Sequence, residues 1–390
     1  MPPNKSHRLR TRLVHSGHDK ETSLGFVNLP AFRGSTVLFP DTATLKTFNQ
    51  RFTYGTHGTP TTHALADAWT ELAGAAGTAL TPSGLSAIAM ALQAVLKGGD
   101  HLLMTDAAYF PARRFADQVL RPYGIETTYY DPTLGAEIAA LIRPNTKAIL
   151  TEAPGSQSMT MQDIPAIAQV AHKHGVCVLM DNTWATPILF PPHERGVDIA
   201  IEAGTKYLSG HSDLLLGLIS ANAEYWPKLR AFVDLYAIPP GPDDTFLALR
   251  GLRTMELRLR ESGKQALEIA RWLQTRPEVR RVLHPALPDD PGHEIWKRDF
   301  LGASGLFSVI LNPVSDAAVA AMLDGLELFG LGFSWGGYES LVIPFDCTTY
   351  RTATAWAPGG PALRLQIGLE DPEDLKADLA AGFARLTAGA

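Results

Sequence analysis

The chain has 390 residues, of which 45% are hydrophobic and 19% charged, proportions typical of a folded globular protein and not of a disordered or collagen-like one. At about 150 residues per domain, this length predicts two to three domains and excludes a disulfide-stapled mini-protein. The 34 basic and 40 acidic side chains give a formal net charge of −6 at pH 7, so no overall basic field would attract nucleic acid or an anionic membrane.

The sequence carries no pattern typical of export or of a membrane span. The segment that begins with Met1 to Lys5 is charged, and no apolar run resembles a signal peptide or is long enough to cross a bilayer. The two cysteines, Cys177 and Cys347, are too few for a disulfide framework or a thiolate zinc site. Cys177 lies in an apolar run and is expected in the core. We therefore expect a cytoplasmic protein in a reducing compartment.

The first 60 residues are rich in Thr, Gly, His and Pro and show little periodicity. This pattern predicts an irregular arm over residues 1–60, of a kind that often reaches across a neighbouring subunit.

Strand-like apolar runs alternate with helical patterns between residues 61 and 255. The helical patterns cover 66–75, 85–96 after Ser83-Gly84, and 164–174 before Gly175. The strand-like runs are 78–81, 102–105, 127–130, 148–151, 176–180, 199–202 and 215–220. This alternation predicts an α/β domain with a mostly parallel seven-stranded sheet covered on both faces.

A long helical pattern over 244–275 is expected to lead into a second domain. Beyond it, strand-like runs at 279–283, 306–311, 341–343 and 363–367 alternate with helical patterns at 316–323 and 372–386. We expect residues 256–390 to form a smaller C-terminal α+β domain.

Familiar nucleotide, zinc-protease and hydrolase motifs are absent from the sequence. His172 and His174 lie two residues apart, so they do not share one face of a helix, and a solvated helix end accounts for them better than a metal site. No metal is expected.

Two neighbouring strand ends carry the residues with the clearest chemistry. Asp181 ends one predicted strand, and Lys206 follows the next. A lysine with a depressed pKa can form a Schiff base with a carbonyl cofactor, and a nearby acid can keep a pyridine nitrogen protonated. These are the needs of pyridoxal 5'-phosphate (PLP).

The sequence also predicts a phosphate-binding site at the start of a helix. Gly84 and Leu85 open a helix whose free backbone N–H groups favour an anion, and Thr205 adds a hydroxyl. Tyr109 follows a strand and is expected to stack on the cofactor ring.

Taken in this order along nearly the whole chain, these residues resemble the Cys/Met metabolism family of fold-type I PLP-dependent enzymes. The resemblance implies that Lys206 forms the internal aldimine, that Asp181 pairs with the pyridine nitrogen and that Tyr109 stacks on the ring. It assigns the phosphate cradle to Gly84, Leu85 and Thr205. It also implies that Tyr54, in the run Tyr-Gly-Thr-His-Gly-Thr over 54–59, reaches the phosphate and active site of a neighbouring subunit.

The resemblance further implies the substrate contacts and the branch of the family. Arg364 matches the arginine that binds the substrate carboxylate, a role suited to its planar guanidinium. Ser334 matches a residue near the same carboxylate, and Trp335 is expected to line the pocket. The run Ser-Trp-Gly-Gly-Tyr-Glu-Ser over 334–340, with Glu-Ala-Pro-Gly-Ser over 152–156, resembles the β-lyase branch and not the γ branch.

Three positions depart from the family pattern. Thr56 stands where an arginine is usual, Ala203 where a serine is frequent, and Phe246 where β-lyases carry a tyrosine. The first two departures remove expected phosphate contacts, which would lower the affinity for the cofactor.

The resemblance implies α,β-elimination of L-cystathionine to homocysteine, pyruvate and ammonia, with Lys206 moving the proton and Tyr109 or Tyr54 assisting. A broader cysteine S-conjugate lyase or cysteine desulfhydrase would share these residues, whereas a γ-elimination or γ-replacement enzyme is disfavoured by the 334–340 run. A non-catalytic protein that has lost its cofactor is disfavoured by the intact Lys206 and Asp181. The expected assembly is a homotetramer built from two active dimers.

Overall fold

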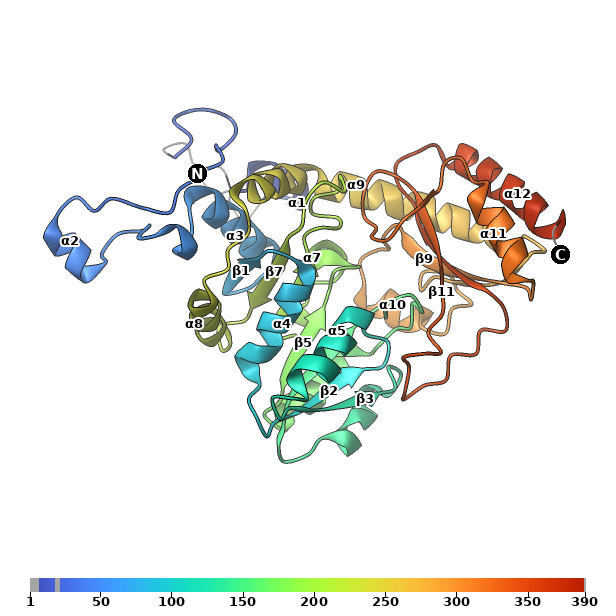
Figure 1. Cartoon of the computed structure of the whole chain (residues 1–390), viewed down its shortest axis with the longest axis horizontal. Coiled ribbons are helices and arrows are strands. Elements are labelled where there is room, and N and C mark those ends of the chain that lie inside the picture. Colours follow the sequence, from blue (N-terminus) through green and yellow to red (C-terminus); the bar gives the residue numbers. More distant parts are fainter. Residues whose placement is uncertain (1–6, 18–21, 389–390) are drawn as a thin grey trace.

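The computed structural model describes residues 7–17 and 22–388, and contains two β-sheets of seven and five strands with helices packed around both (Figure 1). The predicted features at Met1 to Lys5 lie outside the described residues. Within the described ranges, none of the helices is long and apolar enough to cross a membrane.

The larger sheet has the strand order β1-β7-β6-β5-β4-β2-β3. Its strands are β1 (Gly77–Thr81), β2 (His101–Thr105), β3 (Glu126–Tyr130), β4 (Thr146–Glu152), β5 (Cys177–Asp181), β6 (Ile199–Ala203) and β7 (Gly217–Ala221). β7 runs antiparallel to both of its neighbours, and the other pairs are parallel. The prediction of a mostly parallel seven-stranded sheet is confirmed.

Both faces of this sheet are buried except at the edge strand β3, which explains the apolar runs of the other strands. Leu179 contributes to the core under α4 (Gly84–Val95) and α8 (Trp226–Tyr236), whereas the adjacent Met180 faces the core that contains α3 (Pro60–Ala73). Helix α6 (Ile164–Lys173) covers β2, β4 and β5 with a further cluster. Successive side chains therefore serve opposite cores, as the alternation of a strand requires.

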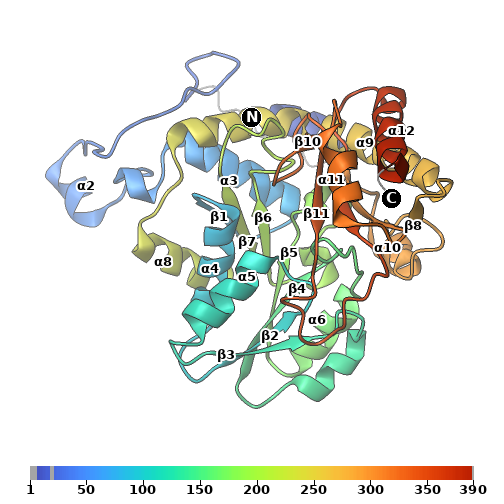
Figure 2. The ribbon, with the colours of Figure 1, turned by 45° about the vertical axis from the view of Figure 1, so that its right-hand side comes forward.

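Helix α9 (Pro242–Gln274) is a continuous helix of 33 residues that joins the two sheets (Figures 1 and 2). Its first half packs through Leu252 and Leu259 into a core that takes in residues of the large sheet and also some of the smaller one, and its second half packs into the small-sheet core through Ile269 and Leu273. The predicted domain boundary at 255/256 would fall inside this helix, and that division stays a prediction.

The smaller sheet has the order β10-β11-β12-β9-β8 and is covered by α11 (Asp316–Asp324) and α12 (Pro372–Ala388). Its strands are β8 (Val279–Leu283), β9 (Leu306–Leu311), β10 (Gly330–Leu331), β11 (Leu341–Phe345) and β12 (Ala362–Gln366). Helix α10 (His293–Asp299) lies between β8 and β9 in the chain. The long predicted strands and both predicted helices of this region are present.

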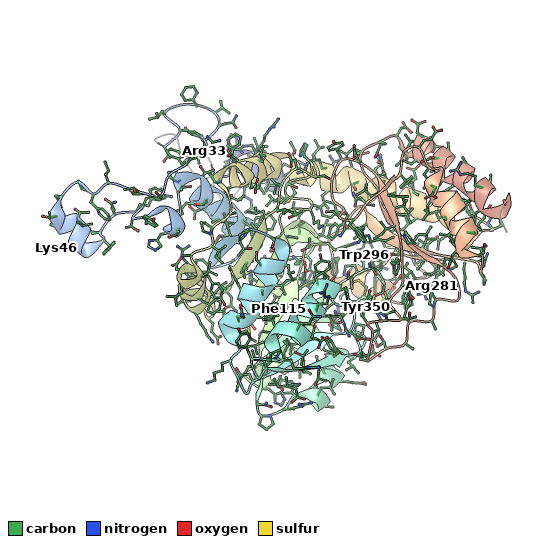
Figure 3. All side chains as sticks on the ribbon, in the orientation of Figure 1. Arg33, Lys46, Phe115, Arg281, Trp296 and Tyr350 are labelled. Atoms are coloured by element: carbon green, nitrogen blue, oxygen red, sulfur yellow. The ribbon has the colours of Figure 1, made fainter. Side chains whose placement is uncertain are left out.

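The N-terminal arm extends from the body of the molecule, with α2 (Thr42–Thr47) at its far end and Lys46 at the tip (Figures 1 and 3). It is less irregular than expected, because it contains α1 (Leu9–His15) and α2. Helix α3 also starts earlier than predicted, since Thr59 and Thr62 form a reciprocal cap ahead of Pro60. Apolar arm side chains are nonetheless open to solvent: Leu24 is 83% exposed and Leu38 is 86% exposed.

The structure also shows the surroundings of the two cysteines and of His172. Cys177 and Cys347 are both buried and unbridged, as expected for Cys177. His172 lies with its Nε2 3.1 Å from a carboxylate oxygen of Asp198. Among the described residues there is no group of three His, Cys, Asp or Glu side chains that could hold a metal ion.

Candidate active site

The carboxyl ends of β4, β5 and β6 meet at one edge of the large sheet. Glu152 and Asp181 are register partners on β4 and β5, and Asp181 pairs with Ile201 on β6. Lys206 lies in the turn directly after β6. The sequence prediction that Asp181 and Lys206 lie at neighbouring strand ends is therefore confirmed in geometry.

Lys206 is a partly buried lysine that points toward the loop before β11 of the smaller sheet. Its Nζ donates a 2.6 Å hydrogen bond to Oγ of Ser334 and lies 5.4 Å from the ring centre of Trp335. Burial, together with the positive charge of Arg364, lowers the pKa of Lys206 to about 8, against the opposing effect of Asp181. A lysine in this state is a nucleophile and a proton carrier near neutral pH.

Asp181 is fixed by Thr183, two residues further on. Oδ1 of Asp181 accepts the Thr183 N–H at 3.0 Å and the Thr183 hydroxyl at 2.6 Å. Burial raises the pKa of Asp181, and the Thr183 bonds and the Lys206 charge act in the opposite direction. A cation placed beside this carboxyl group would favour its ionised form further.

Arg364 and Ser334 come from the part of the chain that forms the smaller sheet. Arg364 lies on β12 and donates from Nη2 to the Ser334 carbonyl at 3.1 Å, while burial lowers its pKa to about 10. Ser334 has φ +79° and Gly336 has φ +84°. A Cβ atom at Gly336 would lie 2.9 Å from the Lys206 carbonyl carbon, so the 334–337 loop packs directly on the lysine turn.

Tyr109 stands at the start of α5 (Phe110–Phe115), with its side chain 43% exposed. Its backbone N–H donates to Oε2 of Glu152 at 2.7 Å. Partial burial and the nearby charges of Asp181 and Glu152 raise the pKa of Tyr109, so its hydroxyl keeps its proton at neutral pH.

The first turn of α4 packs against the end of β6. A Cβ atom at Gly84 would lie 2.7 Å from the Cβ of Ala203, which brings the start of the helix beside Thr205. The first N–H groups of a helix have no acceptor within it, so Gly84 and the 38% exposed Leu85 offer donors to an anion. The Thr205 hydroxyl already bonds the backbone of Leu216, donating to its carbonyl at 3.3 Å and accepting its N–H at 3.1 Å.

Within one chain, Tyr54 lies apart from the other predicted site residues. It lies in the arm, 47% exposed, and its backbone pairs with Thr36. Among the described residues, its side chain has no hydrogen bond or ring contact with the other predicted site residues. Trp335, by contrast, packs 5.5 Å from the Tyr207 ring beside Lys206.

Sequence reasoning missed three residues of this site. Glu152 holds Tyr109, Thr183 holds Asp181, and Glu202 lies buried near both Asn182 and Asp181. Thr183 could have been found from the Asp-x-Thr spacing, because a side chain often bonds the backbone two residues on. Glu152 entered the sequence analysis only as part of the 152–156 run, and neither it nor Glu202 gave a signal for its position in the site, since a strand-end glutamate is usually solvated.

These residues fit PLP. Lys206 can react with a carbonyl group, Asp181 can face a protonated nitrogen, and the α4 N-terminus can take a phosphate. An α/β fold of two sheets with this combination defines the class of PLP-dependent enzymes.

The comparison with protein families makes the assignment specific. The family model described as Cys/Met metabolism PLP-dependent enzyme matches residues 10–384. The chain belongs to this family, and the sequence-based resemblance is confirmed.

The chain is similar to a putative cystathionine β-lyase from Rhizobium johnstonii, at 52% identity over 97% of both chains. It is also similar to the cystathionine β-lyase of Salmonella typhimurium, at 43% identity over 97% of this chain and 99% of the relative. An L-alanine/L-glutamate racemase of Wolbachia pipientis is 40% identical over 96% of each chain. Among solved structures, cystathionine γ-synthase of Xanthomonas oryzae in complex with cystathionine superposes with a TM-score of 0.91 at 33% identity, covering 99% of this chain and 100% of that one.

Proposed function

We propose that this enzyme cleaves the Cβ–S bond of L-cystathionine by α,β-elimination and that, with one water, the products are homocysteine, pyruvate and ammonia. One observation carries the proposal: Lys206, with its lowered pKa, lies between Asp181 on the large sheet and the Ser334–Arg364 pair on the small one. A proton carrier is thus held beside a carboxylate-binding arginine. The names of the relatives supply the substrate, cystathionine.

In this proposal Arg364 binds the substrate α-carboxylate through its planar guanidinium, and Ser334 steadies both the arginine and Lys206. Lys206 removes the Cα proton at Nζ, since its lowered pKa leaves far more free amine near neutral pH than an ordinary lysine has. PLP, when bound, supplies an electron sink for the charge left on Cα.

Other residues hold the cofactor and release the thiol. Asp181 would hold the pyridine nitrogen of bound PLP, Gly84 and Leu85 would hold its phosphate with Thr205, and Tyr54 from a neighbouring subunit would complete the phosphate site. Tyr109, which stays protonated because its pKa is raised, stacks on the ring and can donate a proton to the departing sulfur. Trp335 lines the substrate pocket beside Lys206.

The test is a product analysis of the purified protein loaded with PLP and given L-cystathionine. Pyruvate and homocysteine in equal amounts are expected, and the Lys206→Ala variant should lose turnover by roughly 10²- to 10⁴-fold or more. Formation of 2-oxobutyrate would move the enzyme to γ-elimination. Release of thiol from other cysteine conjugates, with cystathionine inert, would make it a broader lyase.

A second candidate activity, amino-acid racemisation, is favoured by the racemase relative. It is tested by incubating the same preparation with L-alanine and measuring D-alanine. Racemisation without any thiol release would replace the lyase assignment.

A cytoplasmic location and a homotetramer belong to the same proposal. The two unbridged buried cysteines are consistent with a reducing compartment, and the exposed apolar side chains of the arm suit contact with a second copy. Sedimentation of the purified enzyme at several concentrations measures the assembly directly.

A further inference from the structure

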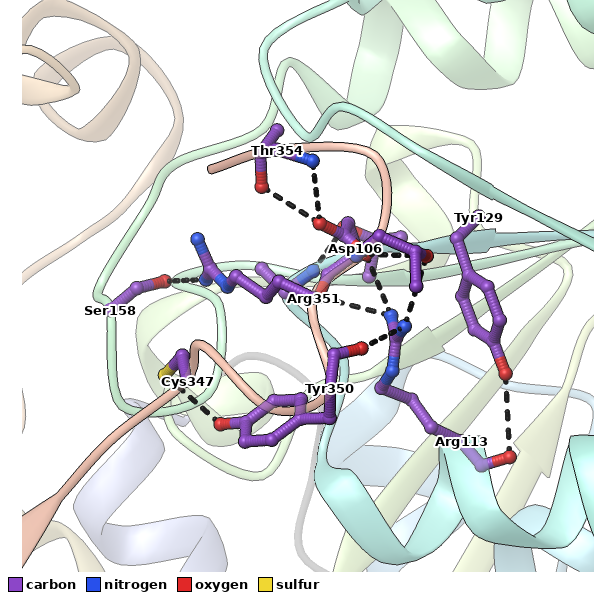
Figure 4. Close-up of polar contacts among 11 residues, drawn as sticks. Asp106, Arg113, Tyr129, Ser158, Cys347, Tyr350, Arg351 and Thr354 are labelled. Atoms are coloured by element: carbon purple, nitrogen blue, oxygen red, sulfur yellow. Dashed lines mark hydrogen bonds and ion pairs between the residues drawn. The ribbon is translucent and has the colours of Figure 1, made fainter. Parts of the chain in front are cut away.

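A segment of the small domain crosses to the large domain between β11 and β12. We call residues 346–354 the strap. Figure 4 shows that its residues meet Asp106 and Arg113 of the large domain, and Figure 3 shows Tyr350 where the strap passes α5. The strap is separated from Asp106 and Arg113 by more than 200 residues in sequence, and it also bonds Gln157 and Ser158.

Asp106 accepts four hydrogen bonds from the strap through both carboxylate oxygens. Thr352 donates to Oδ1 from its N–H at 3.0 Å and its hydroxyl at 3.4 Å. Thr354 donates to Oδ2 from its N–H at 2.9 Å and its hydroxyl at 2.8 Å. Burial alone would raise the pKa of Asp106, but these bonds outweigh it and hold the pKa below its ordinary value.

Arg113 completes the attachment. It is 3% exposed, pairs with Asp106 Oδ1 at 2.9 Å, donates to the Tyr350 carbonyl, and lies with its guanidinium 3.6 Å from the ring centre of Tyr129. Burying an ion pair costs desolvation free energy, which is repaid only when the remaining donors and acceptors of the pair also have hydrogen-bond partners. Here the strap supplies hydrogen-bond partners to Nη2 of Arg113, through the Tyr350 carbonyl and the Thr352 hydroxyl.

Both attached residues flank Tyr109 in the chain. Asp106 stands three residues before Tyr109, and Arg113 stands in the first turn after it, with its N–H 3.3 Å from the Tyr109 carbonyl. The Tyr350 ring also packs 4.8 Å from the ring of Phe110. The Tyr109 residue is 43% exposed, and the hydrogen bonds described for Tyr109 are made by its backbone, so the position of the ring depends on that of its backbone.

We infer that the strap positions Tyr109: its bonds to the Asp106–Arg113 pair fix the segment that carries this tyrosine against the strand-end edge of the large sheet. Asp106, Arg113 and Thr354 are thus positioning residues: Thr354 acts from the strap, through Asp106 and Arg113 of the large domain, on Tyr109. The kinetic part of this inference rests on the proposed role of Tyr109 in the elimination.

The test uses Thr354→Val, which deletes one hydroxyl bond to Asp106 and preserves the side-chain shape. Thr354→Ser keeps the hydroxyl and should restore the wild-type behaviour. Thr348→Val is the matched control, because the Thr348 hydroxyl bonds Asp346 within the strap and not the large domain.

The first readout is hydrogen exchange of the full-length protein, with and without PLP. Faster exchange of the amides over 109–113 is expected in Thr354→Val and not in Thr348→Val or Thr354→Ser. Unchanged exchange in Thr354→Val would overturn the inference, whatever the enzyme's activity.

The second readout is a double-mutant cycle in kcat with Tyr109→Phe. A misplaced catalytic side chain costs up to about 10²-fold, so Thr354→Val should lower kcat roughly tenfold in the wild-type background and have little effect in Tyr109→Phe. Equal losses in both backgrounds would show that the strap does not act through Tyr109. Faster exchange together with a fully active Tyr109→Phe would leave the positioning intact and remove Tyr109 from the proposed chemistry.

Discussion

Lys206 holds a free amine at lower pH than an exposed lysine does, because burial and Arg364 disfavour its charged form. Only the free amine attacks a carbonyl group. In the apo-enzyme, the rate of PLP attachment should therefore rise about tenfold per pH unit below about 8 and level off above it. Stopped-flow absorbance measures the profile.

The Arg364→Gln variant is the control for this profile. Arg364 lowers the pKa of Lys206, so its removal should move the midpoint to higher pH. A midpoint unmoved from that of the wild type would contradict the assigned cause.

Glu202 is a buried acid that takes no part in the proposed chemistry. It is 2% exposed, one of its oxygens has no hydrogen-bond partner, and burial raises its pKa to about 8. In the unfolded chain it would ionise near 4.5. The folded state therefore binds an extra proton between these values, and its stability falls as pH rises through that window.

Glu202→Gln mimics the protonated acid and should remove this pH dependence. The variant should gain stability over the wild type as pH rises from about 4.5 to 8, by up to about 1.4 kcal/mol per unit. Urea unfolding at several pH values measures the difference. The exposed Glu137→Gln is the control, and a gap that stays constant with pH would exclude a buried neutral Glu202.

At the residue scale, the reactive residues at strand ends could be predicted from the sequence, but the residues that hold them in place by hydrogen bonds could not. Asp181 and Lys206 follow apolar strands, so the pattern placed them together. The roles of Glu152 and Thr183 depend on which side chain the folded chain brings within hydrogen-bond distance. Tyr54 stays a prediction, since its proposed site lies on another subunit.

Ala203, which stands where the family frequently has a serine, lies beside the start of α4. The Cβ of Ala203 faces Gly84, so a larger side chain here points at the helix N-terminus. Ala203→Ser would add a hydroxyl donor to the proposed phosphate site. A hydrogen bond to a charged group stabilises by roughly 1.5 kcal/mol, so the dissociation constant for PLP should fall about tenfold.

Equilibrium dialysis of PLP against the apo-enzyme measures this change. Ala203→Gly serves as the size control and should leave the affinity near that of the wild type. An unchanged or weaker affinity in Ala203→Ser would mean that the hydroxyl clashes with Gly84 or does not reach the phosphate.

The elements with strong periodicity were predictable, and those with weak apolar faces were not. Six of the seven strands of the large sheet are mostly buried and stand out as apolar runs, whereas the edge strand β3 is largely exposed or half-buried. Helix α8 buries only Leu229 completely, so its helical pattern is faint in the sequence. Strand β10 has two residues and offers no period at all.

At the scale of the whole molecule, the arm predicts shared active sites. If Tyr54 acts on the neighbour, a mixture of Tyr54→Ala and Lys206→Ala proteins should regain activity, because a mixed dimer assembles one complete site. Each variant alone should be nearly inactive. Kinetic assay after dissociation and reassembly measures the recovery, and mixtures no more active than their components would place Tyr54 in its own subunit's site.

Helix α9 has a consequence for how the molecule melts. Chains of this length often fold and unfold domain by domain. Because the two halves of α9 pack into two cores, unfolding of one core should destabilise the other. Calorimetry of the apo-enzyme should show a single cooperative endotherm. Lys264→Pro, exposed between Leu259 and Ala266, breaks the helix at a cost of about 3 kcal/mol and should split that endotherm into two, one for each sheet.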